Sequence, residues 1–144
     1  MNQKKTLLIS ILSGLMIGFI GVYLIGYLAA IAIPKAYFLW FKENFSAELG
    51  MIIIGVVEQF LAFGILALIA GYFLGKVNRA TWLTNSITCY LSVLFYLSVG
   101  YSLIYDTSIT NPFSGVSSLY FIPMLVLPFC LLISTYVAST KYRN

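Results

Sequence analysis

The stretch from residue 49 to residue 75 reads LGMIIIGVVEQFLAFGILALIAGYFLG, and Glu58 and Gln59 are the charged and amide side chains within it. A helix needs about 20 apolar residues to cross a hydrocarbon layer of about 30 Å. Similar apolar runs cover residues 6–33, 81–105 and 119–139. The four runs predict an all-α membrane protein, a bundle of four transmembrane helices that forms a single integral membrane domain over residues 1–144.

The composition argues against an ordinary water-soluble domain. Of the 144 residues, 61% are hydrophobic and 8% are charged, and the mean hydropathy is +0.99. A soluble domain of this size carries about 25% charged residues. Transmembrane β-strands would be about 10 residues long with alternating polarity, and these runs do not alternate. The first run is also longer than the apolar core of a signal peptide, so we expect it to be a retained anchor.

Most of the basic residues lie at the N-terminus, in the connection 76–80 and at the C-terminus. With four spans, these three segments lie on the same side of the membrane. The opposite side carries Lys35 and Lys42. Because Lys and Arg are enriched on cytoplasmic flanks, we expect a multi-pass protein of the plasma membrane, in a bacterium the inner membrane, with both termini in the cytoplasm. This charge fits contact with the lipid bilayer rather than with nucleic acid. The residues on the shared side are Lys4, Lys5, Lys76, Arg79, Lys141 and Arg143.

The connection between the first two runs, residues 34–48, reads PKAYFLWFKENFSAE. Phe38, Phe41 and Phe45 recur at helical spacing, which predicts a short interfacial helix with its rings in lipid. Such a helix serves either as an aromatic anchor that fixes the tilt of the spans or as a docking surface for a partner. The polar connection 106–118 contains an Asn-Pro pair and is expected to be rich in turns.

Small residues mark the faces along which membrane helices approach closely. In the second run, the small-residue stripe of the first half lies roughly opposite that of the second half. We therefore expect this helix to contact two neighbours, either within the chain or in a homo-oligomer. The predicted packing glycines are Gly14, Gly18 and Gly21 in the first run, and Gly55, Gly64, Gly71 and Gly75 in the second.

The third run carries a polar stripe that includes Asn85, Ser92 and Tyr96. The stripe is either hydrogen-bonding glue between helices or the lining of a hydrated path from the cytoplasmic side. In the fourth run, we expect Pro123 to lie in the first helical turn. Pro128 lies deeper, where it should free the carbonyl of the residue four positions earlier and bend the helix.

Glu58 lies nine residues from the outer end of its run, a depth of ~13 Å. The same count from the outer ends of the third and fourth runs reaches Tyr96 and Pro128, so the three residues are predicted to meet. In a dry site Glu58 would be a neutral hydrogen-bond donor. In a wet site it could ionise and carry protons or bind a cation, with Gln59 beside it. A cationic partner from another subunit is a third alternative.

The chain lacks the residues of common catalytic sites. It has no His, and Cys89 and Cys130 give neither metal-ligand spacing nor a redox pair. We therefore expect no metal, no cofactor and no enzymatic activity. Two functions stay open. The first is an accessory subunit or protective partner of another membrane protein, acting through helix and lipid contacts. The alternative is a proton- or cation-coupled carrier or channel for a small solute, using Glu58.

Overall fold

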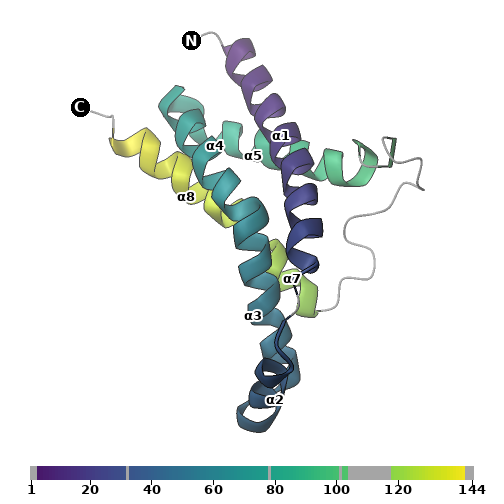
Figure 1. Cartoon of the computed structure of the whole chain (residues 1–144). Helices are drawn as coiled ribbons and strands as arrows, with labels where there is room; N and C mark the ends of the chain where they lie inside the picture. Colours follow the sequence, from purple (N-terminus) through teal and green to yellow (C-terminus); the bar gives the residue numbers. More distant parts are fainter. Residues whose placement is uncertain (1–2, 32, 78, 101, 104–117, 142–144) are drawn as a thin grey trace.

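A computed structural model of the chain describes residues 3–31, 33–77, 79–100, 102–103 and 118–141. In these residues the structure is all-helical (Figure 1). Four of the described helices are long and apolar enough to cross a membrane: Gln3–Ala29, Ala47–Val77, Arg79–Gly100 and Phe121–Lys141. The predicted fold class, with a short helix between the first two spans, is confirmed. Residues 106–117 of the connection expected to be rich in turns, and Arg143, lie outside the described residues.

The first span is helix α1 (Gln3–Ala29), and it leads into the short helix α2 (Lys35–Asn44). Pro34 precedes α2, where its missing N–H removes no helical hydrogen bond. Helix α3 (Ala47–Gln59) follows after two residues, and Ser46 caps it by accepting a hydrogen bond from the Leu49 backbone N–H at 3.1 Å. The result is a helical hairpin that projects from the bundle at the end away from both termini (Figure 1).

The second span continues from α3 through a π-helical turn, η1 (Phe60–Gly64), into α4 (Ile65–Val77). The third span has the same feature. It begins with the 3-10 turn η2 (Arg79–Thr81), continues as α5 (Trp82–Phe95) and ends in a second π-helical turn, η3 (Tyr96–Gly100). A π turn holds about one residue more than an α turn, so each of these segments rotates the helical face that follows it.

The fourth span is broken by its prolines into α7 (Ser118–Met124) and α8 (Val126–Lys141). Pro123 lies near the end of α7, so the prediction that it occupies a first turn is wrong. It is Pro128 that lies in the first turn, that of α8. Pro128 has no N–H to give the Met124 carbonyl, and the chain turns at Leu125 as a result. The bend predicted for Pro128 is therefore present.

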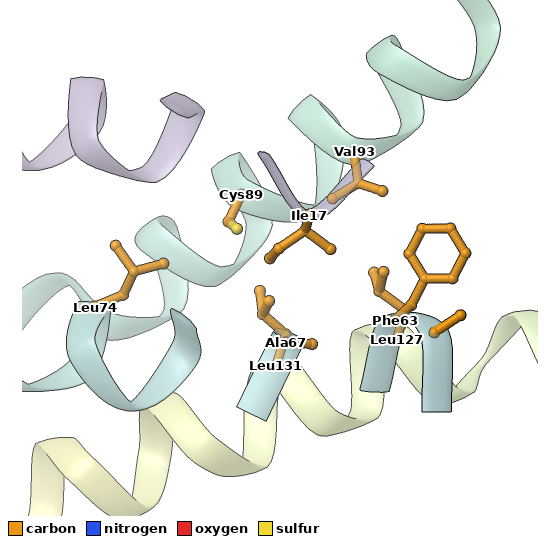
Figure 2. Close-up of a cluster of buried hydrophobic side chains, with 9 residues drawn as sticks. Ile17, Phe63, Ala67, Leu74, Cys89, Val93, Leu127 and Leu131 are labelled. Carbon is orange, nitrogen blue, oxygen red and sulfur yellow. The ribbon is translucent and has the colours of Figure 1, made fainter. Parts of the chain in front are cut away.

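The bundle is built from two close helix pairs, α1 with α5 and α4 with α8. Their inner faces share one core, in which Ile17, Leu74 and Val93 are almost fully buried. Figure 2 shows the core side chains converging from all four spans. The other core residues are Ala62, Phe63, Ala67, Cys89, Leu127 and Leu131. The outward faces carry large apolar side chains, as expected of helices in contact with lipid.

The two small-residue stripes of the second span pack against the same neighbour. Gly55 and Gly71 would lie about 160° apart on a regular helix, but η1 removes about 100° of rotation and leaves them about 60° apart. Gly55 therefore faces Pro123 of α7, and Gly71 faces Ser134 of α8. The second span does contact two neighbours, as predicted, but both of these glycines face the fourth span. The second neighbour, α1, is contacted by the ring of Phe63 at Gly21.

Candidate functional site

Three irregularities of the helices lie around one part of the bundle. They are the π turns η1 and η3 and the break at Leu125 between α7 and α8. Regular helices pack their side chains densely into each other's grooves. Departures from regular geometry at one level leave room between helices, and π turns are frequent at functional sites. Each of the three segments contributes to, or directly adjoins, the wall of a single cavity.

This cavity has a volume of about 200 Å³ and is partly open. Its wall is apolar except for two side chains that carry an amide and a hydroxyl group, Gln59 and Tyr90. Within the part of the chain that the structure describes, no hydrogen bond to the Gln59 side chain is found. The remaining lining residues come from all four spans: Val22, Ile25, Phe63, Val93, Leu94, Leu97, Met124 and Leu127.

The lining residues are the sequence neighbours of the residues predicted to meet at this depth. Gln59, Leu97 and Leu127 line the cavity, where the sequence predicted Glu58, Tyr96 and Pro128. The second, third and fourth spans thus approach one another near the predicted level, with different side chains facing the space between them. The depth of these residues was therefore predicted to within one position, while the helical face that meets the cavity was not.

Glu58 itself is half-buried in the middle of the second span. It follows Gly55 by one helical turn, and Gly55 packs on Pro123, so Glu58 lies toward the side of α3 that α7 approaches. Among the described residues, no hydrogen bond or ion pair to the Glu58 carboxyl is found. The carboxyl group is therefore not fixed by a partner from the described part of this chain.

The polar stripe of the third span is packed against the glycine face of α1. A Cβ atom added to Gly14 would contact the Cys89 carbonyl oxygen and would lie 2.6 Å from Ser92 Cβ. One turn further, a Cβ atom on Gly18 would lie 2.8 Å from Tyr96 Cδ1. This approach of two backbones needs residues without a side chain, which explains the spacing of glycines along α1. Gly14 and Gly18 thus bring the two backbones into contact, and an open groove beside this seam is lined in part by Thr88 and Ser92.

The side chains of the stripe are correspondingly buried. The exposed fractions of Asn85, Ser92 and Tyr96 are 3%, 9% and 6%. Ser92 donates a hydrogen bond to the Thr88 carbonyl within its own helix at 2.8 Å. The Asn85 Nδ2 atom is buried without a hydrogen-bond partner among the residues that the structure describes. The stripe is thus packed inside the bundle, but the hydrogen bond of Ser92 stays within α5, so both interpretations of the stripe remain predictions.

Hydrogen bonds also join the helices near the ends that hold the two termini. The Ser86 and Thr135 hydroxyl groups lie 2.6 Å apart across α5 and α8. Ser134 of α8 donates to the Ala67 carbonyl of α4 at 3.3 Å, beside Gly71. A Cβ atom on Gly75 would contact the Thr135 carbonyl, and one on Gly64 would lie 3.3 Å from Val126 Cγ1. The glycines of the second span thus hold α4 against α8.

The hairpin of α2 and α3 presents a second candidate surface. Phe41 packs on Gly50 of α3, and the Tyr37 hydroxyl donates to the Gly50 carbonyl at 3.1 Å. With those two rings held inward, Trp40 and Phe45 are left 52% and 64% exposed. Lys42 and Glu43 are also exposed on α2. The helix predicted here is present, and its place at a membrane interface stays a prediction. The prediction that the Phe41 ring faces lipid is wrong, because this ring is buried within the chain against Gly50.

Sequence reasoning missed the cavity, although it singled out Gln59 as part of the site. No pattern of residue types marks a π turn, so the face that Gln59 presents could not be read from periodicity. One sequence-based observation did point to it: counting nine residues inward from the outer ends of three spans gave the depth at which these spans approach one another. For metals, the described residues hold no group of three His, Cys, Asp or Glu side chains that could bind an ion.

Comparison with protein families, with curated proteins and with solved structures finds no match to this chain.

Proposed function

We propose that this small polytopic membrane protein acts without enzymatic chemistry, through helix and lipid contacts, as an accessory subunit or protective partner of another membrane protein. The observation that carries the proposal is the close packing of α1 against α5. There the polar stripe of the third span lies under the glycines of α1, where a carrier would need a wetted path. Close packing of this kind supports a role for the stripe in holding α1 against α5.

The exposed rings of α2 supply a surface that reaches beyond the bundle. Trp40 and Phe45 carry large apolar area with few rotatable bonds, which suits binding to a partner or to lipid headgroups. Because Tyr37 and Phe41 already tie α2 to α3, the exposed rings are held on a rigid hairpin. Little conformational entropy would be lost when such a surface binds.

Co-purification after cross-linking in native membranes tests the proposal. The wild-type chain should retain a membrane protein partner, and the double variant Trp40→Ala/Phe45→Ala should retain much less of it. The matched control is Leu83→Ala/Leu91→Ala, which removes two exposed apolar side chains of α5 and should leave recovery unchanged. Recovery of the wild-type chain alone, with no cross-linked partner, would refute the proposed role.

We further place both termini in the cytoplasm of a cell whose plasma membrane holds the protein. Both ends of the chain lie at one end of the bundle, opposite the α2–α3 hairpin (Figure 1). Lys4, Lys76 and Lys141 lie at that same end by their positions in the spans. Reporter fusions at each terminus should be active only as cytoplasmic reporters. A terminal tag that is accessible from outside intact cells would contradict this orientation.

The alternative function, a proton- or cation-coupled carrier or channel, is favoured by one observation. Glu58 is half-buried in mid-span without a partner among the described residues, and the adjacent Gln59 lines the cavity. Glu58→Gln keeps the shape and the hydrogen-bonding capacity and removes titration. A contact protein should tolerate it as well as Glu48→Gln, a control at the exposed start of α3. Loss of activity in Glu58→Gln alone would select the carrier.

A further inference from the structure

The cavity between the four spans has a size that suits one ring. An apolar cavity of about 150 Å³ in another protein stays dry and binds benzene. The cavity here, at about 200 Å³, is somewhat larger and has the same kind of wall. A six-membered ring with small substituents would therefore fill it, and an empty cavity of this size would lose the dispersion contacts that its lining could make.

The position of the cavity determines which molecules reach it. Val93 lies seven residues from the end of the third span, a depth of ~10 Å, and Leu127 lies six residues from the start of the fourth. At this depth the surroundings of a membrane-spanning bundle are hydrocarbon rather than water. The cavity is partly open, so a molecule dissolved in the lipid could enter it and leave any long tail outside.

The Gln59 side chain favours a ligand that carries a hydrogen-bonding group as well as an apolar ring. Its amide is half-buried in the cavity wall and has no hydrogen-bond partner among the described residues. An amide N–H in hydrocarbon is stabilised by an acceptor, and a ring carbonyl is an acceptor that lipid-soluble molecules carry. A plain acyl chain would fill the volume and leave the amide unpaired.

We propose that this cavity binds the ring of a lipid-dissolved quinone, with a ring carbonyl accepting a hydrogen bond from the Gln59 side chain and the tail leaving through the open side. The aromatic rings of Phe63 and Tyr90 and the aliphatic side chains of Val93 and Leu97 form the walls around the ring. This binding site is independent of the partner contacts proposed for α2, because α2 packs near the start of α3 and Gln59 is the last residue of α3.

Binding of tetramethyl-para-benzoquinone to the full-length protein in detergent tests the proposal. This ring is fully substituted, so it does not add to the thiol groups of Cys89 or Cys130. The reference probe is hexamethylbenzene, in which methyl groups replace both carbonyl oxygens. Binding is measured as the rise in midpoint unfolding temperature with probe concentration, at constant detergent. We expect the quinone to bind the wild-type chain more tightly than the hydrocarbon.

Two variants locate the site. Gln59→Met keeps the length of the side chain and removes the amide, so it should weaken quinone binding roughly 2–10-fold and leave hydrocarbon binding unchanged. Leu94→Phe fills the cavity and should weaken both probes more than ~10-fold. Leu91→Phe, on the exposed face of the same helix, is the matched control and should bind as the wild type does.

Three results would overturn the proposal. Equal binding of the two probes would make the cavity a site for hydrocarbon alone, and unchanged quinone binding in Gln59→Met would remove the hydrogen bond. Equal binding by Leu94→Phe and Leu91→Phe would place any binding elsewhere. Helix content and unfolding without probe, measured for each variant, separate loss of binding from loss of folding. None of these results depends on whether a protein partner is recovered with the chain.

Discussion

Replacing Gly14 with alanine should destabilise the bundle, although alanine is the better helix former. The added Cβ atom would contact the carbonyl oxygen of Cys89 and lie 2.6 Å from Ser92 Cβ. Both atoms belong to the fixed part of α5, so neither can turn away as a flexible side chain would. Separating α1 from α5 to make room costs about 1–3 kcal/mol, against a gain of about 0.5–1 kcal/mol in helix propensity. We expect a net loss of about 1–2 kcal/mol.

Gly26→Ala is the matched control in the same helix. No atom lies within 4 Å of the position that its Cβ would occupy, so only the gain in helix propensity should remain. Gly21→Ala should fall between the two, because its new Cβ meets the ring of Phe63, which can turn. The difference between Gly14→Ala and Gly26→Ala is thus about 2 kcal/mol, or roughly 30-fold in the unfolding equilibrium.

Reversible unfolding in mixed micelles, followed by circular dichroism as the denaturing detergent is increased, measures this difference. The three variants should unfold in the order Gly14→Ala, Gly21→Ala, Gly26→Ala. If Gly14→Ala were as stable as Gly26→Ala, then α1 and α5 would not be in backbone contact at this level. The polar stripe would then not be packed against the glycines of α1.

Three further predictions concern other parts of the bundle. The hydroxyl pair Ser86 and Thr135 should show a coupling free energy of ~0.6 kcal/mol in a double-mutant cycle with Ser86→Ala and Thr135→Val, and additive effects would mean that the bond is absent. A small thiol reagent should modify half-buried Cys130 in the folded protein and reach fully buried Cys89 only after unfolding, which mass spectrometry can count. Pro128→Ala restores the N–H that can bond the Met124 carbonyl, so spin labels at positions 121 and 140 should move apart as the fourth span straightens; an unchanged distance would mean that another contact holds the bend.

Much of the architecture follows from the sequence because lipid imposes a simple rule. In hydrocarbon every backbone polar group needs an internal partner, so each apolar run of sufficient length must be helical. The same rule predicted a bend of the fourth span at Pro128, because the missing N–H of Pro128 leaves a backbone carbonyl without a partner. The residues of closest approach on α1 were also predictable, because only glycine permits two helices to bring their backbones together at Gly14 and Gly18.

The site was predictable only in its depth. Counting residues from the span ends found the level at which Gln59, Leu97 and Leu127 meet, because rise per residue is nearly constant along a helix. The count named the adjacent residues Glu58 and Tyr96, because it contains no information on rotation.

The sequence by itself determined that four apolar helices form, where each lies along the chain, and which small residues allow them to approach. The tertiary structure alone decided which faces meet, and the reason is rotational. The π turn at Phe60–Gly64 shifts the helical face that follows it, which turns Gly55 and Gly71 toward one neighbour, and residues of both π turns line the cavity beside Gln59. A count of residues along a regular helix contains no such rotation, so the faces that meet follow only from the folded structure.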